Sequence, residues 1–142
     1  MDISIDVALD HILFLSRRFA KDDYASVIRL ILLELRIPSG REGFRLLCKA
    51  VEALCEDPSI ATMSKLYEDI APESSYFAVD QAIRSALRFG WRDGTDAKWD
   101  LYFPPSKYGV RKCPSNAECI TKLALIITLR ANCCEEVHYE AV

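Results

Sequence analysis

One stripe of polar and aromatic side chains carries the most chemistry in this sequence. Its members recur at three- and four-residue steps, which places them on one side of an α-helix: Phe77, Asp80, Gln81, Arg84, Ser85 and Arg88. Arg pairs with guanine and Gln with adenine, and an apolar group contacts a thymine methyl, so the stripe has the groups that recognise base edges in DNA. A solvated helix face of mixed charge has the same composition, so the residue types alone do not separate the two interpretations.

The opposite side of the same segment is apolar and rich in small residues. Its members are Val79, Ala82, Ile83, Ala86, Leu87 and Gly90. Small side chains let a helix approach its neighbours closely, so we expect this side to face the core. We therefore expect a helix at residues 75–91 whose apolar side packs against the core and whose stripe faces solvent.

A short helix precedes that segment. Apolar residues at helical spacing predict a helix at residues 62–70, and Ala71-Pro72-Glu73-Ser74 predicts a turn after it. A short helix, a tight turn and a longer helix together have the size of a helix-turn-helix unit. The pattern alone is a weak signal, because many helical proteins contain two such helices.

The rest of the chain is also predicted to be helical. Periodic apolar residues predict helices at residues 5–20, 23–36, 41–56, 96–103 and 116–130. The stretch 104–114 contains three Pro and one Gly and predicts a loop. No run of strict alternation predicts a strand. We therefore expect a single, compact all-α domain of six to seven helices over residues 1–142.

The bulk charge sets a condition on DNA binding. The 142 residues carry a formal net charge of −3, whereas DNA-binding domains usually have a basic excess. A local basic patch is therefore needed, and we expect it around Arg84, Arg88, Lys107, Arg111 and Lys112. We see no secretory leader and no apolar run of the roughly 20 residues that a membrane span needs, so we expect a cytoplasmic protein with no membrane contact.

Neither a catalytic centre nor a metal site is expected. The sequence contains no glycine-rich phosphate loop, no His-Glu-x-x-His motif and no nucleophile elbow, and its two His lie near opposite ends. The six Cys include no Cys-x-x-Cys pair, and Cys48 and Cys55 share one face of a predicted helix, as small core residues do. We expect reduced thiols, no cofactor, and a binding protein rather than an enzyme.

Four blocks of sequence connect the chain to a known family. They are VIRLILLELRIPSGREGFRLLCKAV, SKLYEDIA, AIRSALRFGWRDG and PSNAECI, in this order. From about residue 24 to residue 129 the chain resembles the C-terminal DNA-binding effector domain of the stage-zero sporulation master response regulator. The resemblance implies a six-helix domain that inserts the second helix of its helix-turn-helix into the major groove. It also implies promoter DNA as the partner, a homodimer on that DNA, and transcription regulation of sporulation genes.

The resemblance assigns DNA-contacting residues as well. Ser74 and Ser75 match small hydroxyl residues at the start of the family's recognition helix, suited to capping and to phosphate contact. Arg84 matches an arginine that the family also has. A further group matches the loop through which the family approaches the DNA backbone: Lys112, Ser115 and Asn116.

Departures from the family pattern leave a second function open. Ala78 and Gln81 stand where the family has arginines, although Asp80 keeps the acidic residue between them. Losing an Arg–guanine pair typically costs about 1–3 kcal/mol of discrimination. Phe77 on the stripe is also unusual, and an exposed aromatic can mark a protein contact. The alternative is a helix-turn-helix scaffold that serves as a protein–protein interaction module, with weak or no DNA binding.

The organisation of the chain also differs from that of the family. Residues 1–22 predict an added N-terminal helix, residues 23–131 the effector-like domain, and residues 132–142 an acidic tail. The family's receiver domain, with its phosphorylated aspartate, has no counterpart among these predicted elements. We therefore expect a stand-alone, divergent copy that is not controlled by its own phosphorylation.

Overall fold

The described part of the chain is helical and contains no strand. The computed structural model describes the backbone of residues 3–140 and the side chains of residues 5–133. Its seven helices are α1 (Ile3–Leu15), α2 (Tyr24–Glu34), α3 (Glu42–Glu56), α4 (Met63–Ile70), α5 (Tyr76–Asp93), α6 (Asp96–Tyr102) and α7 (Asn116–Glu140). The predicted all-α fold of six to seven helices is thus confirmed.

Polar side chains set where several helices begin. A side-chain oxygen of the residue before the helix accepts a hydrogen bond from a backbone N–H of the first turn, which satisfies one of the unpaired donors there. The capping residues are Asp23 for α2, Thr62 for α4, Ser75 for α5 and Thr95 for α6. Helix α2 ends differently, with Arg36 at φ 62° and the N–H of Ile37 bonded to the carbonyl of Leu32 at 3.0 Å.

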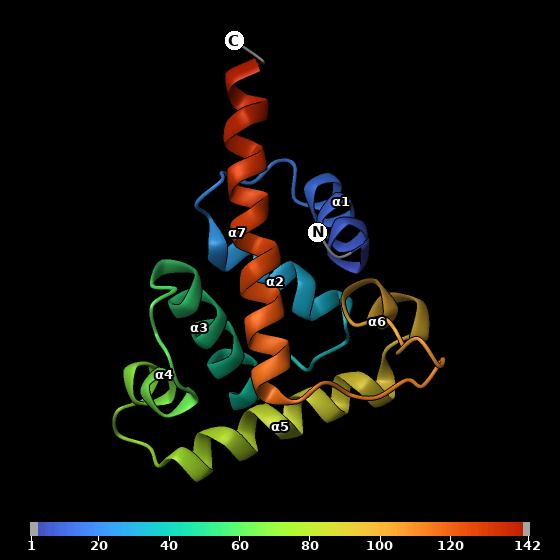
Figure 1. Ribbon diagram of the computed structural model, residues 1–142. Helices are drawn as coiled ribbons and strands as arrows, with labels where there is room; N and C mark the ends of the chain where they lie inside the picture. The colour runs from blue at the N-terminus through green and yellow to red at the C-terminus, as the bar shows by residue number, and fades with distance from the viewer. Residues whose placement is uncertain (1–2, 141–142) are drawn as a thin grey trace.

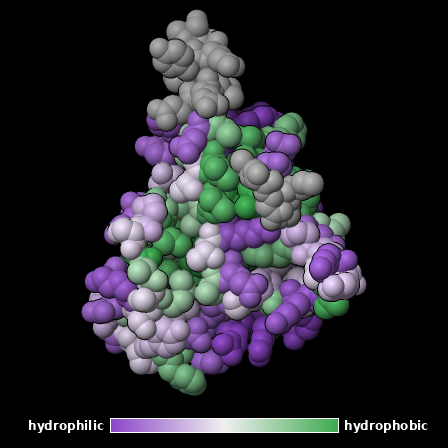
Figure 2. Space-filling view, in the orientation of Figure 1, coloured by the Kyte–Doolittle hydropathy of each residue, from purple (hydrophilic) through white to green (hydrophobic). Residues whose placement is uncertain are grey.

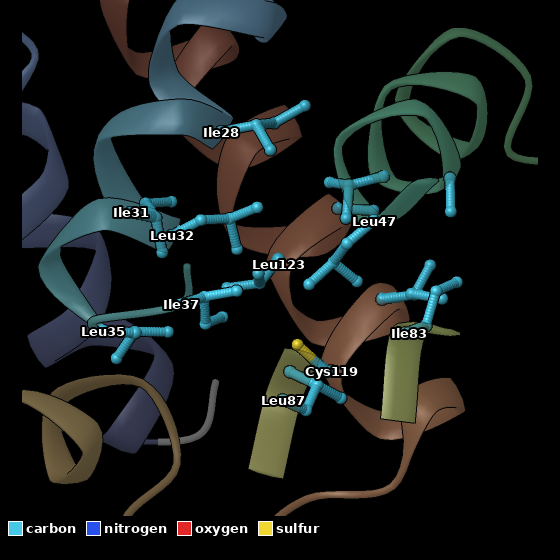
Figure 3. Packing of buried hydrophobic residues seen from close by; sticks show 14 of the residues in the cluster. Ile28, Ile31, Leu32, Leu35, Ile37, Leu47, Ile83, Leu87, Cys119 and Leu123 are labelled. Carbon is cyan, nitrogen blue, oxygen red and sulfur yellow. The ribbon is translucent and has the colours of Figure 1, made fainter. Parts of the chain in front are cut away.

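The core forms around the first half of α7. This helix runs through the middle of the molecule, with α2 and α3 beside it and α5 across its base (Figure 1). Buried aliphatic side chains from these four helices meet there, including Ile28, Leu32, Leu47, Ile83, Leu87 and Leu123 (Figure 3). Helix α5 is therefore fixed to the core along one whole side.

The first and last helices of the chain differ in length from their predicted spans. Helix α1 ends at Leu15, not at residue 20, because backbone carbonyls beyond it bond to Arg130 instead of continuing the helix. Helix α7 continues to Glu140, because no Gly or Pro follows Asn116 to stop it. The stretch that we expected as an acidic tail is thus helical as far as Glu140. None of the described helices has the length and hydrophobicity to cross a bilayer.

Candidate nucleic-acid interface

Helices α4 and α5 form a helix-turn-helix unit. Leu66 of α4, Ala71 of the turn and Val79 of α5 are all buried, so the two helices share one apolar seam. The ring centroids of Tyr67 and Tyr76 lie 4.9 Å apart across the turn. This packing fixes the angle at which α5 leaves the turn.

The inward side of α5 approaches α3 closely enough for backbone contact. A Cβ atom placed on Gly43 would lie 2.1 Å from the carbonyl oxygen of Ala82 and 2.7 Å from Cβ of Ala86. Only glycine fits at that crossing. The predicted inward residues Val79, Ile83, Ala86, Leu87 and Gly90 are buried, while Ala82 is half-buried.

The outward side of α5 is open to solvent. Helix α5 lies along the base of the molecule in Figure 1, and Figure 2 shows that this region is largely hydrophilic. Phe77 is 71% exposed. The predicted residues Gln81, Arg84, Ser85 and Arg88 are exposed too, and they line a shallow hollow together with Phe89 and Arg92. The stripe therefore presents two planar guanidinium groups and an amide on one surface.

Asp80 lies on the edge of the stripe and bonds within the protein. Its carboxylate accepts hydrogen bonds from the phenol of Tyr67 at 3.0 Å and from the side-chain amide of Asn116 at 2.9 Å. Asn116 is only 8% exposed. Burial raises the pKa of the Tyr67 phenol, which therefore stays protonated and donates. The structure thus places Asp80 and Asn116 together, at the point where α4, α5 and α7 meet.

Arg84 is held by the same carboxylate. One of its terminal nitrogens lies 3.5 Å from the second oxygen of Asp80, one helical turn earlier. The side chain remains 48% exposed. The pair orients the guanidinium along the helix and leaves donors facing solvent.

The hydroxyl residues lie at two helix N-termini. The Oγ of Ser75 accepts a hydrogen bond from the N–H of Ala78, and the Oγ of Ser115 accepts one from the N–H of Glu118, both at 3.1 Å. Ser74 is exposed beside Ser75. The free N–H groups at such termini attract anions, including phosphate.

The loop before α7 presents less positive charge than its sequence predicts, because Arg111 is paired. Arg111 forms ion pairs with Asp96 at 2.8 Å and Asp100 at 3.0 Å, and its guanidinium lies 4.7 Å from the ring centroid of Trp91. Its charge is therefore neutralised and serves to fasten the loop to α6. Lys112 remains exposed on this loop.

Two basic residues near α5 were missed by the sequence interpretation. Arg92 follows Arg88 on the stripe by one helical turn, and Arg41 lies just before α3. Both guanidinium groups lie over the ring of Phe89. The continued spacing of the stripe could have identified Arg92, but only the crossing of α3 and α5 brings Arg41 to this surface.

These features define a helix-turn-helix domain with an exposed second helix. Comparison with known families agrees: the family described as "Sporulation initiation factor Spo0A C terminal" matches residues 28–127. The chain therefore belongs to this family, which consists of DNA-binding regulator domains and is not an enzyme family. No curated protein matches the chain.

Proposed function

We propose that the chain is a sequence-specific DNA-binding transcription regulator that places α5 in the major groove of promoter DNA. The observation that carries this proposal is the outward side of α5, where Gln81, Arg84 and Arg88 are exposed on one stripe while the opposite side is buried in the core. These side chains have the donor and acceptor groups that distinguish base pairs in that groove.

The local charge around α5 supports this role in spite of the net charge. Arg84, Arg88 and Arg92 follow one another along α5, while Asp80 on the same stripe pairs with Arg84 and exposed Asp93 pairs with Arg92. Among the described residues, Arg88 forms no ion pair with a carboxylate, and both paired arginines keep much of their side chains exposed. A basic surface of this kind attracts the phosphate backbone even when the whole molecule is acidic.

The proposed contacts fall into two groups. Gln81 and Arg84 contact base edges, and Phe77 reaches a thymine methyl. Ser74, Ser75, Ser115 and Lys112 contact phosphates and set the register of the helix. Ala78 is too short to reach a base, so the sequence bound differs from the one that two arginines at positions 78 and 81 would select.

The test begins with selection of duplexes from a random library by the whole chain. Binding of the selected duplex is then measured against salt concentration, with a scrambled duplex alongside. The expected result is a preference for the selected duplex and a log affinity that falls linearly with log salt. The stoichiometry of the complex shows whether two copies bind, as the proposed homodimer requires.

Substitutions on α5 test whether this helix discriminates between the selected and the scrambled duplex. Arg84→Ala and Gln81→Ala are expected to reduce discrimination by roughly 1–3 kcal/mol each. Arg18→Ala is the matched control, because Arg18 is exposed on the connection between α1 and α2. This connection passes behind α7 in the upper part of Figure 1, far from α5 at the base. Equal binding of selected and scrambled duplexes by the wild type would contradict sequence-specific recognition.

The exposure of Phe77 supports a second candidate function. Phe77 is 71% and Tyr76 49% exposed, and two neighbouring aromatic side chains are typical anchors of a protein interface. In this alternative the stripe binds a protein. Absence of duplex binding at low salt, with a partner interaction that Phe77→Ser abolishes, would favour it over DNA recognition.

A further inference from the structure

Two arginines from different parts of the chain converge on one aromatic ring. The guanidinium carbon of Arg41 lies 3.8 Å from the ring centroid of Phe89, and that of Arg92 lies 4.4 Å from it. Arg41 precedes α3, whereas Phe89 and Arg92 belong to the last turns of α5. This three-residue group, the Arg41–Phe89–Arg92 cluster, adjoins the hollow on the stripe.

Close packing of the backbone creates this convergence. A Cβ atom on Gly90 would lie 2.6 Å from Cγ1 of Ile37 and 2.9 Å from the carbonyl oxygen of Leu35. Because residue 90 is glycine, the segment between α2 and α3 crosses directly against α5. The contact of Gly43 with Ala82 fixes the start of α3 against the same helix. Arg41, which lies between these two crossings, is therefore held beside Phe89.

The charge of the cluster is not balanced locally. Among the described residues, Arg41 and the neighbouring Arg88 form no ion pair with a carboxylate. Arg92 pairs with Asp93, but both side chains are more than half exposed, and such pairs contribute little. The surface at this end of α5 is therefore suited to a polyanion.

We propose that the Arg41–Phe89–Arg92 cluster clamps the phosphate backbone at one edge of the groove that α5 enters. This inference rests on the DNA-binding function proposed above. Arg92 follows Arg84 by eight residues, or about 12 Å along a helix axis. The major groove is also about 12 Å wide. Because this rise exceeds half the width of the groove, a helix that crosses the groove with Arg84 on base edges carries Arg92 to the sugar-phosphate wall. The crossing of α3 places Arg41 beside it.

The ring of Phe89 restrains the side chains of Arg41 and Arg92. An arginine side chain loses much rotamer freedom when it is fixed on a ligand. Stacking on Phe89 restrains both guanidinium groups before DNA arrives, which reduces that loss while their N–H groups stay available. The two arginines thus supply the positive charge and Phe89 supplies the restraint, so mutations can test the two effects separately.

The experiment measures the salt dependence of binding to the duplex that the wild-type chain selects. Each phosphate contact contributes about 0.9 to the slope of log affinity against log salt, so the double variant Arg41→Ala/Arg92→Ala is expected to reduce the slope by about 1.8. The preference for selected over scrambled duplex is expected to remain. Arg41→Lys/Arg92→Lys, which keeps both charges, is expected to retain the slope, and Arg18→Ala serves as the distant control.

A variant of the aromatic ring tests the restraint of the arginines separately from their charge. Phe89→Leu keeps every positive charge and an apolar side chain at this half-buried position. It is expected to lower affinity about three- to tenfold at each salt concentration without a change in slope. Thermal unfolding of each variant verifies that the fold is kept.

The outcomes distinguish the two proposals. If the wild type binds the selected duplex and Arg41→Ala/Arg92→Ala keeps the wild-type slope, the clamp is refuted and the DNA-binding function stands. If the wild type binds no duplex at low salt, the proposed function itself fails, and the clamp fails with it.

Discussion

The side-chain amide of Asn116, the first residue of α7, donates hydrogen bonds to both the backbone carbonyl and the carboxylate of Asp80 on α5, each at 2.9 Å. The same carboxylate accepts a hydrogen bond from Tyr67 on α4 and pairs with Arg84. One aspartate therefore connects three helices to the arginine at the centre of the stripe. Asp80 and Asn116, which are predicted from the sequence to contact DNA, thus also hold the exposed side of α5 in position.

Loss of the Asp80 carboxylate is expected to destabilise the helix-turn-helix. Asp80→Ala removes the acceptor of Tyr67 and one acceptor of Asn116, both of which are buried or nearly so. A buried donor without a partner costs about 1–3 kcal/mol, so we expect a decrease of that size in the free energy of unfolding. Urea unfolding measures it. Asp69→Ala is the control, because the carboxylate of Asp69 pairs with exposed Lys65, and its loss is expected to cost less than about 1 kcal/mol. Equal effects of the two variants would contradict the positioning role of Asp80.

The crossing of α3 and α5 offers a second test. Gly43→Ala introduces a methyl group 2.1 Å from the carbonyl oxygen of Ala82, so the two helices must move apart. We expect a loss of about 1–3 kcal/mol in unfolding free energy. Gly40→Ala has no atom within 4 Å of the new methyl group and is expected to be neutral or slightly stabilising. The comparison is made by thermal and urea unfolding. A Gly43→Ala protein as stable as Gly40→Ala would show that the crossing tolerates a wider spacing.

The sequence predicts the fold well because its signals are local. Apolar periodicity, the polar residues Ser75 and Ser115 before two helices, and the turn at residues 71–74 all depend on neighbours along the chain. The inward and outward sides of α5 follow from the same periodicity. The family match over residues 28–127 confirms the resemblance that the four blocks of sequence indicate.

The electrostatics of the site depend on contacts between distant segments, which periodicity does not describe. The sequence interpretation counted Arg111 in the basic patch, but Asp96 and Asp100 on α6 neutralise it. It omitted Arg41, which reaches α5 only through two glycine crossings. Charges therefore have to be counted after the helices are packed.

Alkaline pH is expected to destabilise the protein through its buried thiols. Burial raises the pKa of Cys48 to about 11 and that of Cys55 to about 12, from an ordinary value of 9.0. The unfolded chain therefore loses these protons first. This contribution to stability is fully present below pH 9.0 and falls as the pH rises toward the two folded-state values, by up to about 1.4 kcal/mol per thiol for each pH unit.

The measurement compares unfolding free energies near about pH 8, where the thiols are protonated in both states, and near about pH 10, where the unfolded chain has lost these protons and the folded protein keeps them. In Cys48→Ala/Cys55→Ala the decrease between these values is expected to be smaller than in the wild type. A residual decrease is expected from Cys113, Cys119, Tyr67 and Tyr102, because burial raises the pKa of these thiols and phenols as well. An unchanged pH dependence in the double variant would exclude Cys48 and Cys55 as its cause.

Arg130 gives the strongest expected effect on the added N-terminal helix. Its side chain is fully buried and donates five hydrogen bonds to the segment after α1: to the hydroxyl and the carbonyl of Ser16, and to the carbonyls of Phe19, Ala20 and Lys21. These acceptors are neutral oxygens at the end of α1, where the helix dipole favours a positive charge. Arg130 therefore fastens α1 to α7.

Arg130→Met preserves the length of the side chain and removes every donor. Because five hydrogen bonds between α7 and the segment after α1 are lost together, we expect a loss of about 3 kcal/mol or more in unfolding free energy. Hydrogen exchange locates the effect: amides of α1 and of residues 16–21 are expected to lose protection first, while those of α5 follow only with global unfolding. Arg18→Met, at an exposed position on the same connection, is expected to leave both measurements unchanged. Uniform loss of protection across α1 and α5 would mean that α1 is an integral part of the core, and that Arg130 stabilises the whole domain rather than fastening one helix to it.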